Sequence, residues 1–412
     1  MSLFRYSGLS TKVRAMSGKL LTQEDYQQLG SLSSVPEVIA FLKKKPSYAQ
    51  LLEKEDERSL HRGRAEGLIM QSLFMDFSRL YRFSSLDQRR FLDGFFMRYE
   101  ISCLNMIIRS IMTQGERLVD TEEYREVFER HSQIPLAQAS SADTMESLIA
   151  ALSGTPYKKV ISDVYGSNSR ELFDYELALD VFFFDRFWKL IKKDLKEEDQ
   201  EVIARSVGTY IDALNLTWVY RAKKYYRMSA AEVYALIVPI HYRLTREQVR
   251  QMAEAADENE LLAVVKNTKY GKYLDGEEQL NLERCMEKMQ EAVHSVLLRR
   301  KPYSAACLDV YLYRKEREAR KIITAMERRA FPHLWFLHPR FLPRQFPGKM
   351  EGSKKGFPQN EGRFRENPFP IRFPGRKSMS AGKWIMPLNR AKTGCFLTST
   401  GWKRETISII SE

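Results

Sequence analysis

The sequence contains the same short pattern three times, and this repeat constrains the fold more than any other feature. Each copy starts with Ser or Asp, has Glu three residues later, and continues with apolar residues at helical spacing as far as a tyrosine. The copies start at Ser34, Asp143 and Asp257, and their tyrosines are Tyr48, Tyr157 and Tyr270. Ser or Asp followed by Glu at this spacing is typical of a capping box, which satisfies the free N–H groups of a helix's first turn. The pattern therefore predicts three copies of a short capped helix.

Two long amphipathic helices are expected after each tyrosine. The first has apolar residues three or four positions apart, which predicts one buried face. These residues are Ile69, Leu73, Phe77 and Leu80 in the first repeat, Leu177, Val181, Phe184 and Trp188 in the second, and Leu282, Met286, Met289, Val293 and Val296 in the third. The second helix is expected at about 88–112, 198–226 and 304–326, with Glu100, Asp212 and Glu316 at similar places. No alternation typical of strands is present, so the repeats are predicted to be all-α.

A further helix start precedes the capped helix in two of the repeats. Thr22 lies 15 residues before Glu37, and Thr245 lies 15 residues before Glu260. Both threonines are expected to be N-caps. In the middle repeat the corresponding step, around Pro135, is weaker.

These features divide the chain into three helical repeat units and a tail. The units are expected at residues 1–115, 116–227 and 228–327, and the tail at 328–412. Nine of the 15 prolines and eight of the 20 glycines lie in the last 82 residues, where Phe-Pro occurs five times and Asp is absent. Such a segment has no apolar stripe to bury and is predicted to be disordered. Because the character changes abruptly, we hypothesise a reading-frame shift near codon 327, which would leave the third unit incomplete.

The positive charge of the chain is concentrated in this tail. The net charge is +13, and residues 331–412 alone have 15 Lys or Arg against 5 Asp or Glu. Residues 1–330 have 51 basic and 48 acidic residues and are nearly neutral. The high isoelectric point therefore gives no support to nucleic-acid binding by the folded part.

No motif of an enzyme or metal site is present. The sequence lacks a phosphate-binding loop, a dinucleotide-binding glycine motif, a zinc-protease motif and a serine-hydrolase motif. The six histidines lack metal-ligand spacing, and Cys103, Cys285, Cys307 and Cys395 are far apart, as in a reducing compartment. We therefore expect no catalytic, cofactor-binding or metal-binding residues. Since neither a signal peptide nor a membrane-spanning stretch is found, a soluble cytoplasmic protein is expected.

Several segments in order resemble one known family, the C (also called d) component of the central rotor in V-type and archaeal A-type rotary ATPases. They cover about residues 4–326. The similar segments are Lys12-Val13-Arg14-Ala15-Met16 near the start, Leu152-Ser153-Gly154-Thr155-Pro156-Tyr157, Ile237-Val238-Pro239, and Tyr311-Leu312-Tyr313-Arg314-Lys315-Glu316-Arg317-Glu318. Each is weak alone, but their order and spacing are specific.

The resemblance implies a fold and a role. The fold would be three similar helical bundles about a pseudo-threefold axis, shaped like a funnel. The chain would be a non-catalytic central-rotor subunit of an ATP synthase or V-type ATPase, on the cytoplasmic face of the membrane. It would couple the central-stalk subunits to the membrane proteolipid ring for H⁺ or Na⁺ transport, with no cofactor, nucleic acid or small-molecule substrate. The sequence decides neither the ion nor the direction of the ATP reaction.

One other function remains open on the residues alone. An α-helical scaffold that binds peptide or protein partners would also show repeated helices and no catalytic motif. Its repeat would be unusually long, because common helical repeats span about 33–47 residues.

Overall fold

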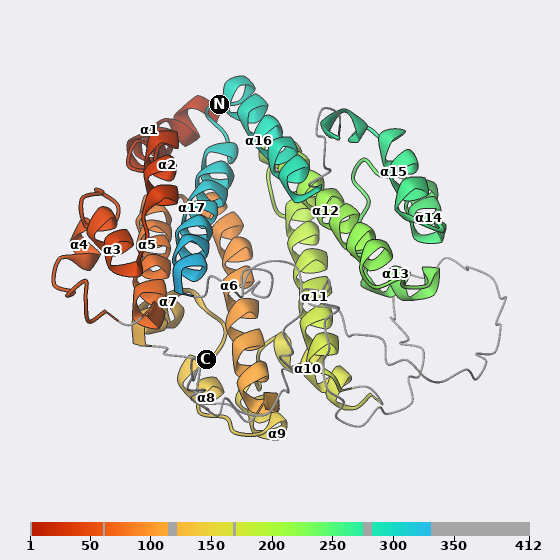
Figure 1. The fold of residues 1–412 in the computed structure, drawn as a ribbon, viewed down its shortest axis with the longest axis horizontal. Helices are drawn as coiled ribbons and strands as arrows, with labels where there is room; N and C mark the ends of the chain where they lie inside the picture. The colour runs from red at the N-terminus through yellow and green to blue at the C-terminus, as the bar shows by residue number, and fades with distance from the viewer. Residues whose placement is uncertain (1, 61, 114–121, 168–169, 275–281, 331–412) are drawn as a thin grey trace, which may run out of the picture.

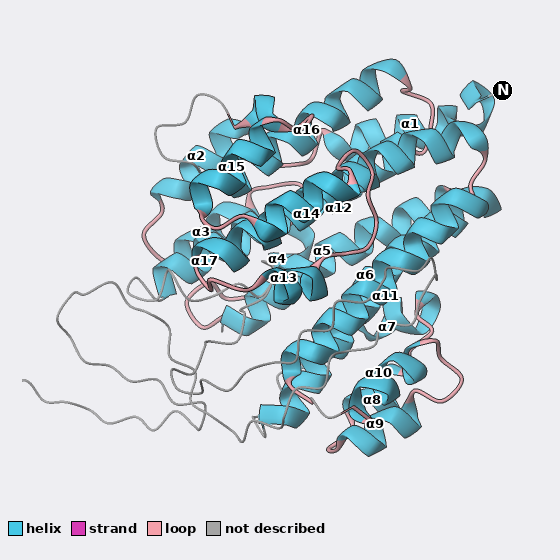
Figure 2. Ribbon diagram, turned by 90° about the vertical axis from the view of Figure 1, so that its right-hand side faces the viewer, coloured by secondary structure: helices cyan, strands magenta, loops and turns pink. Residues whose placement is uncertain are grey.

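The computed structural model describes residues 2–60, 62–113, 122–167, 170–274 and 282–330. These residues form seventeen α-helices and one short 3₁₀ helix, and they contain no strand. Figure 2 shows long helices running side by side with clusters of short helices against them. The predicted all-α fold is therefore confirmed.

The helices follow the predicted order of short and long elements. The first repeat comprises α1 (Ser2–Ser17), α2 (Gln23–Ser31), α3 (Val35–Lys43), α4 (Ala49–Leu52), α5 (Arg62–Phe83) and α6 (Leu86–Thr113). The second comprises α7 (Glu122–His131), α8 (Leu136–Ser140), α9 (Met145–Ala151), α10 (Tyr157–Tyr165), α11 (Leu172–Lys193) and α12 (Glu197–Lys224). The third comprises α13 (Ala230–Leu236), α14 (Arg246–Glu254), α15 (Glu258–Lys266), η1 (Gly271–Tyr273), α16 (Leu282–Arg300) and α17 (Ala306–Ala330).

The helix caps confirm most of the predicted helix starts. Thr22, Ser34, Thr245 and Asp257 are N-caps whose side chains accept a backbone N–H of the first turn. In the second repeat the cap is Thr144, one residue later than the predicted Asp143. Glu37 and Glu260 do not complete a strict box, because their carboxylates accept N–H groups of Ser33 and Ala256, one residue before each cap. The charge still lies at the positive end of the helix, where it is favourable.

The long helices pair across repeats as well as within them. Helix α6 packs on α11, α5 on α17, and α12 on α16. In Figure 1 the last helix, α17, lies among the first helices of the chain rather than at the far edge. A core cluster there joins Ile322, Ile323 and Met326 of α17 to Val38 and Leu42 of α3. The first and last segments of the described chain therefore share one core.

The predicted apolar stripes are buried except at Val181 and Trp188 of α11 and at Val296 of α16, which are partly buried. Ile69, Leu73, Phe77 and Leu80 are fully buried in α5. In α11, Val181 and Trp188 are only partly buried, whereas Leu179, Phe183 and Phe187 are buried. Because α11 contacts α6, α10 and α12, it has a wider buried surface than a single stripe predicts.

One prediction concerns a part of the chain that lies outside the described residues. Residues 331–412, and with them almost all of the predicted tail at 328–412, are outside the described residues. Helix α17 continues to Ala330, slightly past the predicted end of the third unit. Within the described residues, no helix is both long and apolar enough to cross a lipid bilayer.

A glycine of α12 allows this helix to lie very close to the segment that precedes α14. A Cβ at Gly208 of α12 would lie 2.4 Å from Cγ of Tyr242. Cβ of Tyr242, which is bonded to the backbone, would also be only 2.8 Å away, so the side chain cannot swing clear. Gly208→Ala should therefore lower the free energy of unfolding by about 1–3 kcal/mol. Gly8→Ala in α1 is the control, because a Cβ there meets nothing within 4 Å. Its gain in helix propensity should raise stability by up to ~1 kcal/mol. Thermal unfolding would contradict the prediction if both variants melted alike.

Candidate functional site

The three repeated tyrosines occupy equivalent, buried environments. Tyr48, Tyr157 and Tyr270 are 1%, 0% and 3% exposed. Each donates its hydroxyl hydrogen bond to a buried carboxylate: Tyr48 to Glu318 at 2.7 Å, Tyr157 to Glu100 at 2.5 Å, and Tyr270 to Asp212 at 2.7 Å. The tyrosines of the sequence repeat therefore occupy equivalent places in the structure.

Each carboxylate also accepts backbone N–H groups at the start of the same short-helix segment. Glu318 accepts the N–H of Leu21 at 2.6 Å, and Glu100 accepts that of Gln133 at 2.5 Å. Asp212 accepts the N–H groups of Tyr242, Arg243 and Leu244. In each repeat, one carboxylate therefore bonds to the loop that begins a short-helix segment and to the tyrosine near the end of that segment. We call these three arrangements the tyrosine–carboxylate contacts.

The partners in each contact come from consecutive repeats. Glu100 on α6 holds the tyrosine of the second repeat, and Asp212 on α12 holds that of the third. Glu318 on α17, the last described helix, holds Tyr48 of the first repeat, 270 residues away in the sequence. The three repeats are thereby joined in a closed cycle.

For the third repeat, the sequence pattern indicates the wrong acidic residue. It matches Glu316 with Glu100 and Asp212, but Glu318 makes the contact. Two residues on an α-helix are about 200° apart, so Glu316 lies on nearly the opposite face of α17. It accepts hydrogen bonds from Arg98 and Tyr99 of α6 instead. Their helix positions differ too little to separate the two acids in the sequence: Glu100, Asp212, Glu318 and Glu316 lie 14, 15, 12 and 10 residues after the starts of their helices.

The contact that closes the cycle differs from the other two in having a buried cation. Lys315 is 0% exposed, and its Nζ lies 2.9 Å from Glu318 and 3.1 Å from the Tyr48 hydroxyl. The ammonium also lies 4.3 Å from the centroid of the Tyr48 ring. A buried lysine needs such a carboxylate, because an unpaired charge in the interior is very costly.

Burial controls the ionisation of these groups. Desolvation raises the pKa of Asp212, although the Tyr270 hydroxyl and three backbone N–H groups oppose the shift. Burial and the neighbouring carboxylate raise the pKa of all three tyrosines, so their hydroxyls remain protonated donors.

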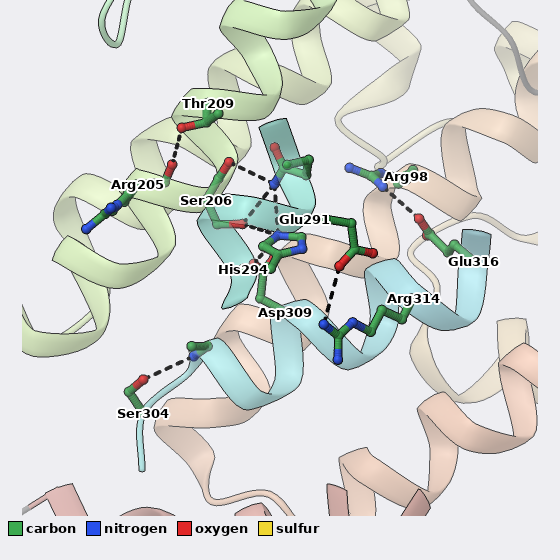
Figure 3. A network of polar contacts seen from close by, with 12 residues as sticks. Arg98, Arg205, Ser206, Thr209, Glu291, His294, Ser304, Asp309, Arg314 and Glu316 are labelled. Carbon is green, nitrogen blue, oxygen red and sulfur yellow. Dashed lines mark hydrogen bonds and ion pairs between the residues drawn. The ribbon is translucent and has the colours of Figure 1, made fainter. Parts of the chain in front are cut away.

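A second polar cluster lies where α12, α16 and α17 meet (Figure 3). His294 is 1% exposed, and its Nε2 lies 2.8 Å from the Ser206 hydroxyl and 3.7 Å from Asp309. Serine, histidine and aspartate together suggest a hydrolase triad, but in a triad the serine and the aspartate contact opposite ring nitrogens. Here both approach Nε2, and Nδ1 has no hydrogen-bond partner. The geometry does not support nucleophilic catalysis.

Both titratable groups in this cluster are strongly shifted by burial. Desolvation, with the charges of Arg314 and Arg317, lowers the pKa of His294 to about 3. Desolvation raises the pKa of Asp309 to about 6, although Ser206 and Arg98 oppose it. At neutral pH the imidazole is therefore neutral beside a buried carboxylate.

Other residues considered for chemistry are buried or dispersed. Cys103, Cys285 and Cys307 are buried and form no disulfide, and Cys395 lies outside the described residues. Burial raises the pKa of Cys103 to about 12 and of Cys307 to about 11, which disfavours the reactive thiolate. Among the residues that the structure describes, no three His, Cys, Asp or Glu side chains are placed to hold a metal ion.

The buried lysine gives a matched pair of variants that tests the tyrosine–carboxylate contacts. Glu318→Gln leaves Lys315 uncompensated and should lower the free energy of unfolding by about 3–5 kcal/mol. Glu100→Gln makes the same chemical change without a buried cation, so it should cost only about 1–2 kcal/mol. Urea denaturation measures both. Adding Lys315→Met to Glu318→Gln should recover much of the loss, and equal losses for the two single variants would contradict the role assigned to Lys315.

Substitutions of Asp309 and of His294 are expected to change the pH dependence of folding stability in opposite directions. As pH falls through about 6, folded Asp309 takes up a proton that the unfolded chain binds only near pH 4, which raises stability. As pH falls below about 6.5, the unfolded chain protonates His294 and the folded chain does not, which lowers stability. Asp309→Asn should therefore make stability fall more steeply on acidification than in the wild type, by up to ~1.4 kcal/mol per pH unit. His294→Gln should make it fall less steeply. Denaturation between about pH 7 and pH 4.5 measures the slopes, and parallel curves for all three proteins would refute the assignment.

Comparison with known proteins identifies one family. The family model described as ATP synthase (C/AC39) subunit matches residues 9–331. The chain is 26% identical over 345 residues to the C subunit of the A-type ATP synthase of Methanosphaera stadtmanae, covering 80% of this chain and 85% of the relative. The relatives of the same name from Methanobrevibacter smithii and Methanocaldococcus jannaschii are 23% and 21% identical, covering 81% and 78% of this chain and 87% and 82% of their own lengths.

The matched range includes all three repeated tyrosines and their carboxylate partners, and it ends at the close of α17. Since it covers well over half of the sequence, the chain belongs to the ATP synthase (C/AC39) subunit family.

Proposed function

We propose that this protein is a non-catalytic central-rotor subunit that couples the central stalk of a rotary ATPase to its membrane proteolipid ring. It would act on the cytoplasmic face of the membrane, in transport of H⁺ or Na⁺. The family, and the similarity to the C subunits of A-type ATP synthases, support membership of such a complex. The coupling role is our inference from the construction of the molecule.

The closed cycle of tyrosine–carboxylate contacts is the observation that carries this proposal. A subunit that transmits torque must resist shear between its parts. Here each repeat is fixed to the next by a buried, hydrogen-bonded carboxylate, and Glu318 joins the last helix to the first repeat. Buried, well-satisfied polar contacts are directional, so they specify one relative position of the parts more sharply than apolar packing alone. The Ser206–His294–Asp309 geometry, which does not support nucleophilic catalysis, fits a mechanical role.

We also propose that residues 1–115, 116–227 and 228–327 correspond to three similar helical bundles about a pseudo-threefold axis. The three equivalent contacts support this arrangement, because each joins one repeat to the next. In this arrangement the bundles are interlocked, since the carboxylate that holds each short-helix segment comes from the preceding repeat. Superposition of the three tyrosines with their carboxylates in an experimental structure would test it.

Reconstitution tests the proposed coupling. The purified chain alone is expected to show no ATP hydrolysis, and adding it to a V-type complex depleted of this subunit should restore ATP-driven ion uptake. Uptake is measured for H⁺ and for Na⁺ in separate assays. Glu318→Gln, which weakens the closing contact, should restore less uptake per ATP hydrolysed than Glu100→Gln at a temperature where both variants are folded.

Two outcomes would contradict the proposal. ATP hydrolysis by the isolated chain that survives stringent purification would make it an enzyme. Failure to restore uptake, together with recovery of peptide partners and no rotary-ATPase subunits in a pulldown from native membranes, would favour an α-helical scaffold.

A further inference from the structure

One end of the protein is formed by the three turns that join its pairs of long helices. These turns connect α5 to α6, α11 to α12 and α16 to α17, and α1 lies across all of them. Asp199 at the start of α12 accepts hydrogen bonds from Arg5 and Tyr6 of α1 and from the N–H of Ala305 before α17. Gln88 of α6 donates to the Arg5 carbonyl. Figure 2 shows the N-terminus at this end of the long helices.

Large apolar side chains project into solvent at this end. Phe4 is 90% exposed, Leu86 is 77% exposed and Phe83 is 60% exposed. The segments that carry them meet at this end, because Lys12 of α1 lies 4.8 Å from the centroid of the Phe83 ring and Gln88 of α6 bonds to the Arg5 carbonyl. Three large apolar side chains this exposed at one end of the molecule indicate an interaction surface.

Basic residues surround these apolar side chains. Helix α1 and the segments 82–90 and 299–301 contain nine Lys or Arg and one acidic residue, Asp87. That residue forms an ion pair with Lys196 of the neighbouring turn. This third turn, 194–199, adds one lysine and four acidic residues, so the whole end has ten basic and five acidic residues and a net charge of +5. The net positive charge of this end, concentrated on α1 and the segments 82–90 and 299–301, favours an anionic partner. The C-terminal residues 331–412 are not such a partner, because 15 of them are basic and only 5 are acidic.

We propose that this end, formed by α1 and the segments 82–90 and 299–301, docks on the surface of an anionic lipid bilayer. Phe4, Phe83 and Leu86 enter the headgroup region, and the surrounding lysines and arginines contact lipid phosphates. Separate apolar tips within a broad basic field suit a fluid bilayer, where each side chain finds its own place. The inference goes beyond the proposed coupling role, since it assigns this surface a lipid partner in addition to any protein partner.

Vesicle binding by the full chain tests the proposal. Sedimentation is compared for vesicles of phosphatidylcholine alone and of phosphatidylcholine with phosphatidylglycerol. Phe4→Ser/Phe83→Ser/Leu86→Ser should reduce partitioning into the anionic vesicles by about tenfold or more. Arg299→Gln/Arg300→Gln/Lys301→Gln should also reduce it, with a smaller effect at high salt because the charges are screened. The control Tyr225→Ser/Tyr234→Ser removes two other exposed aromatic side chains, 60% and 42% exposed, and should change nothing.

The C-terminal residues are identical in all these proteins, so any binding through them is common to every variant. Equal partitioning of the apolar triple variant and the wild type would overturn the proposal. So would an apolar triple variant that binds vesicles normally but no longer binds purified central-stalk subunits, because the surface would then be a protein interface.

A substitution that introduces a fluorescent side chain gives a second test, which does not depend on a loss of vesicle binding. Phe4→Trp places an indole at the most exposed apolar position of this end. Its fluorescence, taken as the difference from the unsubstituted chain, should shift to the blue with anionic vesicles and be quenched by brominated lipid. Absence of both changes while the protein sediments with the vesicles would place the lipid contact elsewhere and overturn the proposal.

Discussion

The contact between a buried tyrosine and a buried carboxylate of the preceding repeat is the interaction on which the rest of this structure depends. A carboxylate in the interior is tolerated only if its oxygens are hydrogen-bonded. Glu100, Asp212 and Glu318 meet this condition with a tyrosine hydroxyl and the backbone N–H groups of one loop. Since these groups are shielded from solvent, removing any partner leaves buried polar groups unsatisfied. Each short-helix segment is therefore held in one position.

This arrangement explains why the first and last helices of the described chain lie side by side. Helix α17 supplies both the apolar residues that cover α3 and the carboxylate that holds Tyr48. The buried Lys315 makes this closing contact more dependent on its partner than the other two, because the lysine loses its counter-charge if Glu318 is neutralised. The family match covers the same cycle of helices from α1 to α17. At one end of the long helices, the buried Asp199 ties α1 to the starts of α12 and α17 in a similar way.

Much of the fold and part of the site could be predicted from the residues. Periodicity located the long helices, and cap residues such as Thr22 and Thr245 located short ones, because both signals are local. The predictions that were wrong depended on helix orientation. Glu316 and Glu318 are equally acidic, and only the rotation of α17 decides which one faces Tyr48. Val181 and Trp188 lie on the predicted stripe of α11, but the positions of α6 and α12 decide which residues are covered most.

The sequence by itself determined the helical class, the three repeats and the tyrosine in each, because capping and apolar spacing act within a few residues of the chain. The tertiary structure alone decided which acid meets which tyrosine. The partners are 57 and 58 residues apart in two contacts and 270 residues apart in the third. Contacts over such distances depend on how whole helices pack, and local propensity carries no information about that. The same holds for the His294 cluster and for the basic, apolar end of the molecule, which gather residues from helices that are remote in the sequence.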